Sequence, residues 1–235
     1  MSSKPQNQRQ PLRPLLVGLV LAGCVALIAS DFIHHALTRA VGGPELDDGT
    51  TNRLWHADAP LATFAIHLHM AFGAVITGLA IFQTVGPLRR RAPWVHRWSG
   101  RVVIVCAIVT ALGGLVYMAV KGTVGGPDMT LAFTVYGLLM LWCAWQTAQR
   151  AMARDYDAHR EWALRLIILA MASWIYRVHY GLWFVTMHGW EVNTEDFSGL
   201  FDRVNVWAFF VPYLCILELV LWRKRRMRSV LPMTS

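Results

Sequence analysis

Residues 61–120 read LATFAIHLHMAFGAVITGLAIFQTV, then GPLRRRAPWVHRWSG, then RVVIVCAIVTALGGLVYMAV. Two long apolar runs therefore flank a turn that is rich in arginine. At about 1.5 Å per residue in an α-helix, each run is long enough to cross roughly 30 Å of hydrocarbon. The pattern predicts a helical hairpin in a membrane, with its basic turn in the cytoplasm.

The rest of the chain repeats this pattern, so we predict an all-α polytopic membrane protein with six transmembrane helices in one domain. The predicted spans cover residues 12–37, 61–85, 101–120, 130–149, 162–188 and 204–222. The second and third spans form one hairpin, and the fourth and fifth form another. Their turns are similar, with His96-Arg97-Trp98 in the first and His159-Arg160-Glu161-Trp162 in the second. We expect a four-helix core of two similar hairpins, flanked by the first and sixth helices, and a kink at Pro212.

The formal charge of +8 arises from arginines and lysines that gather in alternate connections. The positive-inside rule therefore places both termini in the cytoplasm, in the inner membrane of a bacterium. The basic groups are expected to contact phospholipid headgroups rather than nucleic acid. They are Lys4, Arg9 and Arg13; Arg89–Arg91, Arg97 and Arg101; Arg150, Arg154, Arg160 and Arg165; and residues 223–226 with Arg228. The other connections carry acids, among them Asp47, Asp48, Asp58, Asp128, Glu195 and Asp202.

The cysteines all lie inside predicted spans, so no structural disulfide is expected. Residues 21–24 read LAGC, as a lipoprotein cleavage site does, but the apolar run continues to Ala29. An uncleaved first helix is therefore expected, while cleavage before Cys24 stays open.

Several short motifs resemble a family of bacterial multi-pass membrane proteins, domain of unknown function 2306. They are His69-x-x-x-Gly73, Gln83, HRWSGR at 96–101, AHREW at 158–162, Arg177, Pro212 and Glu218. The resemblance runs from about residue 69 to residue 225. It implies a membrane location and a multi-pass helical fold, and it brings no activity with it.

The inner end of the predicted core offers a haem site. His96 and His159 both begin outward-running helices and could be the axial ligands of a b-type haem, with Arg101 and Arg165 near its propionates. His96 shares a helix face with Thr110, Gly114 and Tyr117, and His159 shares one with Ser173 and Arg177. A cap of the helix ends, or a site for an anion or a quinone, would use the same residues.

The outer half offers a ligand pocket of His69, Arg177, His179 and Gln83. His67 and His69 are about 200° apart on the helix, and His69 is the one expected to face the core, because Gly73, Ile76, Ala80 and Gln83 continue its face. A guanidinium within the membrane requires an acid, a carbonyl cluster or an anionic ligand. Asp31 and Asp202 are the candidate acids for Arg177.

Three functions follow as hypotheses. The first is a small b-type cytochrome or quinone-linked redox protein. The second is a transporter or binding protein for a small anion or ligand. The third is an accessory subunit without chemistry of its own, whose protein partners the sequence does not identify. The sequence has no nucleotide-binding, zinc-hydrolase or serine-hydrolase motif, so it predicts neither a catalytic residue nor a metal site.

Overall fold

A computed structural model of the chain describes residues 12–45, 52 and 54–230, so Lys4, Arg9, Asp47 and Asp48 lie outside the described residues. The described part is helical and contains no strand. Its elements are α1 (Arg13–Ile28), α2 (Ser30–Val41), α3 (Pro60–Ala80), η1 (Ile81–Thr84), α4 (Gly86–Arg91), α5 (Pro93–Lys121), α6 (Gly126–Met152), α7 (Tyr156–Met187), α8 (Leu200–Ala208) and α9 (Val211–Val230).

Four helical segments are long and apolar enough to cross a membrane: Pro60–Thr84, Pro93–Lys121, Gly126–Met152 and Leu200–Met227. The pair α1 and α2 makes a fifth if it counts as one broken span. The all-helical membrane fold is thus supported with four or five spans. The predicted sixth is α7, whose 32 residues include Arg177 and His179 within the apolar stretch. These two polar residues lower its hydropathy, and the count of six stays a prediction.

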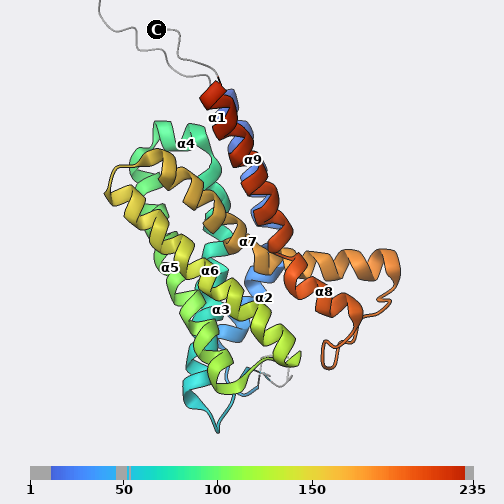
Figure 1. The fold of residues 1–235 in the computed structure, drawn as a ribbon. Coiled ribbons are helices and arrows are strands. Elements are labelled where there is room, and N and C mark those ends of the chain that lie inside the picture. The colour runs from blue at the N-terminus through green and yellow to red at the C-terminus, as the bar shows by residue number, and fades with distance from the viewer. Residues whose placement is uncertain (1–11, 46–51, 53, 231–235) are drawn as a thin grey trace, which may run out of the picture.

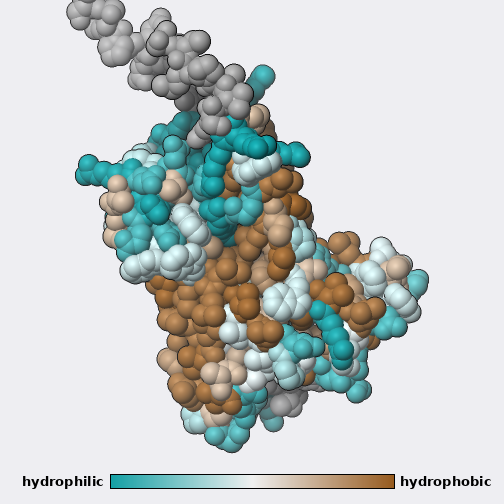
Figure 2. Space-filling view, viewed as in Figure 1, coloured by the Kyte–Doolittle hydropathy of each residue, from teal (hydrophilic) through white to brown (hydrophobic). Residues whose placement is uncertain are grey.

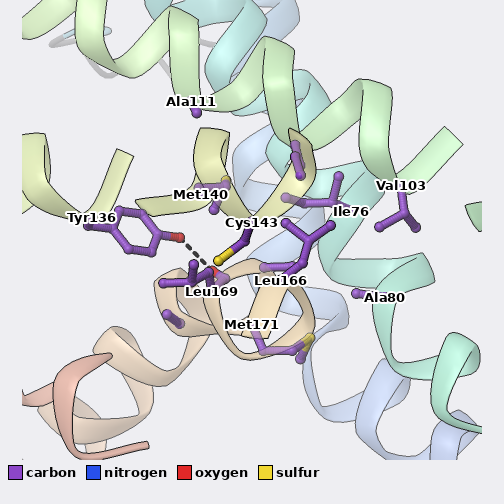
Figure 3. Packing of buried hydrophobic residues seen from close by; sticks show 14 of the residues in the cluster. Ile76, Ala80, Val103, Ala111, Tyr136, Met140, Cys143, Leu166, Leu169 and Met171 are labelled. Atoms are coloured by element: carbon purple, nitrogen blue, oxygen red, sulfur yellow. Dashed lines mark hydrogen bonds between the residues drawn. The ribbon is translucent and has the colours of Figure 1, made fainter. Parts of the chain in front are cut away.

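The two expected hairpins pack as pairs, α3 against α5 and α6 against α7, and α5 also packs against α6. One apolar core joins them, with Ile76 from α3, Val103 from α5, Met140 from α6 and Leu169 from α7 (Figure 3). In the same view the Tyr136 hydroxyl donates to the backbone oxygen of Leu169 at 2.6 Å. This bond ties α6 to α7 inside the core.

The surface divides into zones. Figure 2 shows a hydrophobic band across the long helices, with hydrophilic residues gathered at the end that carries α4 and the end of α9. Large apolar side chains such as Leu112, Leu138 and Trp145 are exposed on these helices. Such a band is expected where lipid replaces water around the protein.

Two predicted helices are broken. Residues 12–37 were expected to form one helix, but α1 and α2 meet at an angle of 51° around Ala29. Residues 204–222 were expected to form a kinked helix, but α8 ends at Ala208 and α9 begins at Val211. Pro212 lies just after this break; it has no N–H to donate, and its ring clashes with the carbonyl four residues earlier, that of Ala208, where α8 ends. Phe209 and Phe210, at the break itself, are fully buried in the core.

At the end of the molecule opposite α4, polar contacts join neighbouring segments. Lys121, the last residue of α5, binds Asp58 just before α3, with 2.8 Å between Nζ and Oδ2. The ammonium group holds the pKa of the Asp58 carboxyl below its usual range. Figure 1 also shows the start of α1 and the end of α9 at the same end of the molecule, while the second half of α7, in orange, extends away from the other long helices.

Candidate functional site

A narrow cavity lies where α2, α3, α5, α6 and α7 meet. Its accessible volume is about 40 Å³, enough for roughly three water molecules. His69 lies nine residues into the 25-residue segment Pro60–Thr84, so the cavity is well inside the apolar zone. The lining residues are Phe32, Ala36, His69, Met70, Gly73, Ala74, Ile76, Thr77, Thr110, Tyr136, Met140, Ala170, Ser173 and Arg177.

Arg177 supplies the charge of this cavity from its rim, since the residue lines the cavity and is also exposed at the molecular surface. Its Nη1 donates to the backbone oxygen of Ser173 at 3.0 Å and to Ser173 Oγ at 3.4 Å, and its guanidinium lies 4.7 Å from the ring centre of Phe32. Because Ser173 is one turn earlier in α7, the side chain runs back toward the start of the helix rather than out toward its end. No described residue accepts a hydrogen bond from Nε or Nη2, so most of the five N–H donors of the guanidinium remain available.

A second cation, Arg39, lies near Arg177. Arg39 lies within electrostatic reach of it, as does His35, whose Nε2 accepts a hydrogen bond from Arg39 Nε at 2.8 Å. The expected acid partners are not there. Neither Asp31 nor Asp202 forms an ion pair with Arg177, and no acid lines the cavity among the described residues. Of the partners that the sequence left open for Arg177, neither candidate acid is therefore the one observed.

Thr110 presents an unused hydroxyl. Its side chain is only 5% exposed, it lines the cavity, and its Oγ1 has no hydrogen-bond partner. Other helical threonines donate to the carbonyl four residues earlier, namely Thr38, Thr77, Thr130, Thr134, Thr147 and Thr186. A buried hydroxyl without a partner costs about 1–3 kcal/mol, so this one calls for a further occupant of the cavity.

His69 is fixed from α5. Its Nδ1 donates to the backbone oxygen of Thr110 at 2.8 Å. Two glycines make room for it: a Cβ on Gly114 would lie 2.9 Å from His69 Nδ1, and one on Gly113 would lie 2.5 Å from the backbone oxygen of Ala65. His67 points elsewhere, to the backbone oxygens of Thr63 and Gly42.

The other two residues of the expected pocket lie outside the cavity. His179 is held between Asn205 Oδ1 at 2.8 Å and the Tyr213 hydroxyl at 2.9 Å, and so joins α7 to α8 and α9. Gln83 lies in η1 and donates to Ser99 Oγ at 2.6 Å, beside the turn between α4 and α5.

The inner residues expected to bind haem lie at the starts of α5 and α7. His96 and His159 are within electrostatic reach of each other, and His159 Nδ1 donates to the backbone oxygen of Thr147 at 2.9 Å. Arg165 forms a two-pronged ion pair with Glu218, at 2.5 and 2.9 Å, and stacks on Trp162. Arg101 stacks on Trp98.

Sequence reasoning missed Thr110, Ser173, Phe32 and Tyr136 as cavity residues. A signal for two of them was present, because Thr110 and Ser173 lie on the polar faces that were assigned to His96 and His159. Farther along α5 and α7 these faces line the cavity together with His69.

Comparison with known families gives one match. Residues 65–221 match the family described as predicted membrane protein, domain of unknown function 2306. The matched region contains every residue that lines the cavity except Phe32 and Ala36 of α2. No curated protein and no solved structure matches the chain. Since the match covers most of its length, the chain belongs to this family of predicted membrane proteins.

Proposed function

We propose that the protein binds a small monovalent oxyanion between its helices, midway through the cytoplasmic membrane of a bacterium. The observation that carries this proposal is the unpaired guanidinium of Arg177 in a cavity without an acid among the described residues. A charge among the apolar segments of a membrane protein is costly unless a counter-charge and hydrogen bonds accompany it, and here an exchangeable anion would supply both. A site at this depth is where transporters hold their substrates, so transport is the expected use.

The cavity also favours a ligand class. Two oxygens of a carboxylate-like ion match the fork of a guanidinium, and the hydroxyls of Ser173 and Thr110 are further donors. Apolar walls from Phe32, Met70 and Met140 disfavour a doubly charged ion, because only one fixed charge opposes it. With about 40 Å³ of space, ions of three or four non-hydrogen atoms such as formate or acetate fit best.

Formate binding to purified protein in detergent tests the proposal. The wild type should gain thermal stability with increasing formate, because a ligand that binds only the folded state stabilises it. Arg177→Met should lose this response while remaining as stable as the wild type without formate, since no acid is stranded. Arg177→Lys keeps the charge but loses the fork, so the affinity should fall about 10- to 150-fold for a lost bond of about 1.5–3 kcal/mol. Arg203→Gln on α8 is the control, and an unchanged formate response in Arg177→Met would refute the site.

Thr110→Val gives a second arm of this test. Removing the unpartnered hydroxyl should raise the stability of the ligand-free protein by about 1–3 kcal/mol while weakening formate binding. The control is Thr147→Val, which is equally buried but loses a bond of 2.6 Å to the Cys143 carbonyl. A Thr110 variant that is both less stable and fully able to bind would contradict a ligand-directed hydroxyl.

A haem-binding redox protein is the second candidate. One observation favours it: the bond from His159 Nδ1 to Thr147 leaves Nε2 open, as in many metal-bound histidines. Against it, the layer below His96 and His159 is filled by buried Val103 and Leu166, and Arg165 is already paired with Glu218. A Soret band in protein from haem-sufficient cells, lost in His96→Ala and in His159→Ala, would reverse this preference.

A further inference from the structure

We propose that the cavity takes up one proton with each oxyanion, and that His69 Nε2 is the atom that holds or shares it. The inference rests on the anion site proposed above and adds the coupled ion. It makes the protein a proton-linked binder of small monocarboxylates and similar ions.

The ring hydrogen of neutral His69 lies on Nδ1. The backbone oxygen of Thr110 can only accept, so the 2.8 Å contact to His69 Nδ1 places the hydrogen on that nitrogen. In a neutral imidazole the other nitrogen, Nε2, then carries a lone pair that accepts. No described residue forms a hydrogen bond with Nε2.

Turning the ring of His69 over would place the carbon Cδ2 where Nδ1 now lies and would break the 2.8 Å hydrogen bond to the Thr110 carbonyl. The ring packs closely on Gly114, where a Cβ would lie 2.9 Å from Nδ1 and 3.3 Å from Cε1. Gly113 brings the backbones together at the same level, since a Cβ on this glycine would lie 3.1 Å from His69 N. The contact between α3 and α5 thus keeps Nδ1 on the Thr110 carbonyl. Nε2, on the opposite side of the ring, is then the nitrogen that is free to meet a ligand.

An anion in the cavity presents lone pairs, and these repel the lone pair of a neutral Nε2. One proton removes the repulsion in either of two ways. It sits on Nε2, which then donates to the anion, or it sits on the ligand oxygen, which donates to Nε2. The proton comes from solvent in both cases, so the occupied cavity carries one proton more than the empty one.

Apart from His35, no other described group near His69 is placed to take this proton. From α7 comes Arg177, which stays protonated. From α6 comes Tyr136, whose hydroxyl already donates to Leu169. From α5 come the Thr110 hydroxyl and glycine, which has no side chain to titrate. On α3 itself, the two ring nitrogens of His67 contact the backbone oxygens of Thr63 and Gly42. From α2 come Arg39 and His35, so His35 is the one competing histidine among the described residues.

The experiment measures proton uptake during formate binding. Neutralised sodium formate is added to weakly buffered, purified protein at about pH 7.5, and a pH-sensitive dye reports the protons taken up. Binding is followed in parallel by thermal stability. The wild type should take up about one proton per bound formate, as linkage requires when a group is protonated only in the complex. His69→Gln should bind formate without proton uptake, because a glutamine amide donates without a titratable proton.

The controls separate the two proposals. His35→Gln should keep both binding and proton uptake, and Arg177→Met should lose both. Formate binding by the wild type without proton uptake, or undiminished uptake in His69→Gln, would overturn the proton inference and leave the anion site standing. Failure of formate, acetate and nitrate to bind the wild type at all would overturn the anion site and the proton inference with it.

Discussion

At the scale of single residues, Asp202 shows how this chain keeps a charge inside without a cation. Its carboxylate is fully buried and accepts from the Tyr180 hydroxyl at 2.5 Å, from Asn193 N at 2.8 Å and from Gly199 N at 3.1 Å. The two hydrogen bonds from backbone N–H groups attach the connection between α7 and α8 to the first turn of α8. Asp202 therefore stabilises the fold at the outer end rather than neutralising Arg177.

Asp202→Asn is expected to lower the free energy of unfolding by about 1–3 kcal/mol, because its one oxygen can replace Oδ2 for the two backbone N–H groups, whereas its NH2 would stand where Oδ1 now accepts from the Tyr180 hydroxyl. The measurement is the thermal midpoint of the purified protein in detergent. Asp196→Asn is the matched control, since Asp196 is exposed and its hydrogen bonds, such as the one from Ser198 N at 3.0 Å, stay within its own turn. Equal midpoints for the two variants would show that the Asp202 bonds contribute nothing.

At the scale of elements, the contact of α3 with α5 positions the cavity. Small residues allow two membrane helices to approach closely, and Gly113 is such a position, against the backbone of Ala65 and His69. The approach brings the Thr110 carbonyl to His69. Formation of the site thus depends on the spacing of two helices as well as on its own side chains.

Gly113→Ala should push α3 and α5 apart, because the added methyl would lie 2.5 Å from the Ala65 oxygen. We expect a loss of about 1–3 kcal/mol of stability, the usual cost of overpacking, together with weaker formate binding as His69 shifts. Gly181→Ala in α7 is the control, since a Cβ there meets nothing within 4 Å. It should be neutral or slightly stabilising through helix propensity. A Gly113 variant that behaves like the Gly181 variant would contradict the close approach.

At the scale of the whole molecule, α7 decides the topology. Four spans and the α1–α2 pair together would give five crossings, which is an odd number. If α7 also crosses, the number is six. The start of α1 and the end of α9 lie at the same end of the molecule, as an even number of crossings requires (Figure 1).

Reporter fusions along the chain test this count. Fusions after Gln149 and after Trp222 should report the cytoplasm, and fusions near Asp128 and Glu195 should report the outside, because the basic flanks remain inside. The fusion near Glu195 is decisive, since it lies directly after α7. A cytoplasmic signal there would mean that α7 does not cross, and the predicted count of six would fall.

The sequence by itself determined the class of the protein and the approximate position of its long helices. Apolar length and the spacing of charges are local properties, so they predicted α3, α5 and α6 to within a few residues at most ends. Helical periodicity also selected His69 over His67, because the small residues on the His69 face are visible in the chain. Depth alone marked Arg177 as a residue in need of a partner.

Only the tertiary structure decided which groups meet. Arg177 had two candidate acids in the sequence, but Asp202 accepts a hydrogen bond from Tyr180 and binds the start of α8. The cavity is lined by Thr110 and Phe32 instead. The breaks at Ala29 and before Pro212 likewise depend on packing, since the buried rings of Phe209 and Phe210 fill the core between the two pieces. Helix pairing joins residues about 40 to 100 positions apart, such as His69, Thr110 and Arg177. Hydropathy and helical periodicity describe the residues of a single helix, so they carry no information about which helices pair.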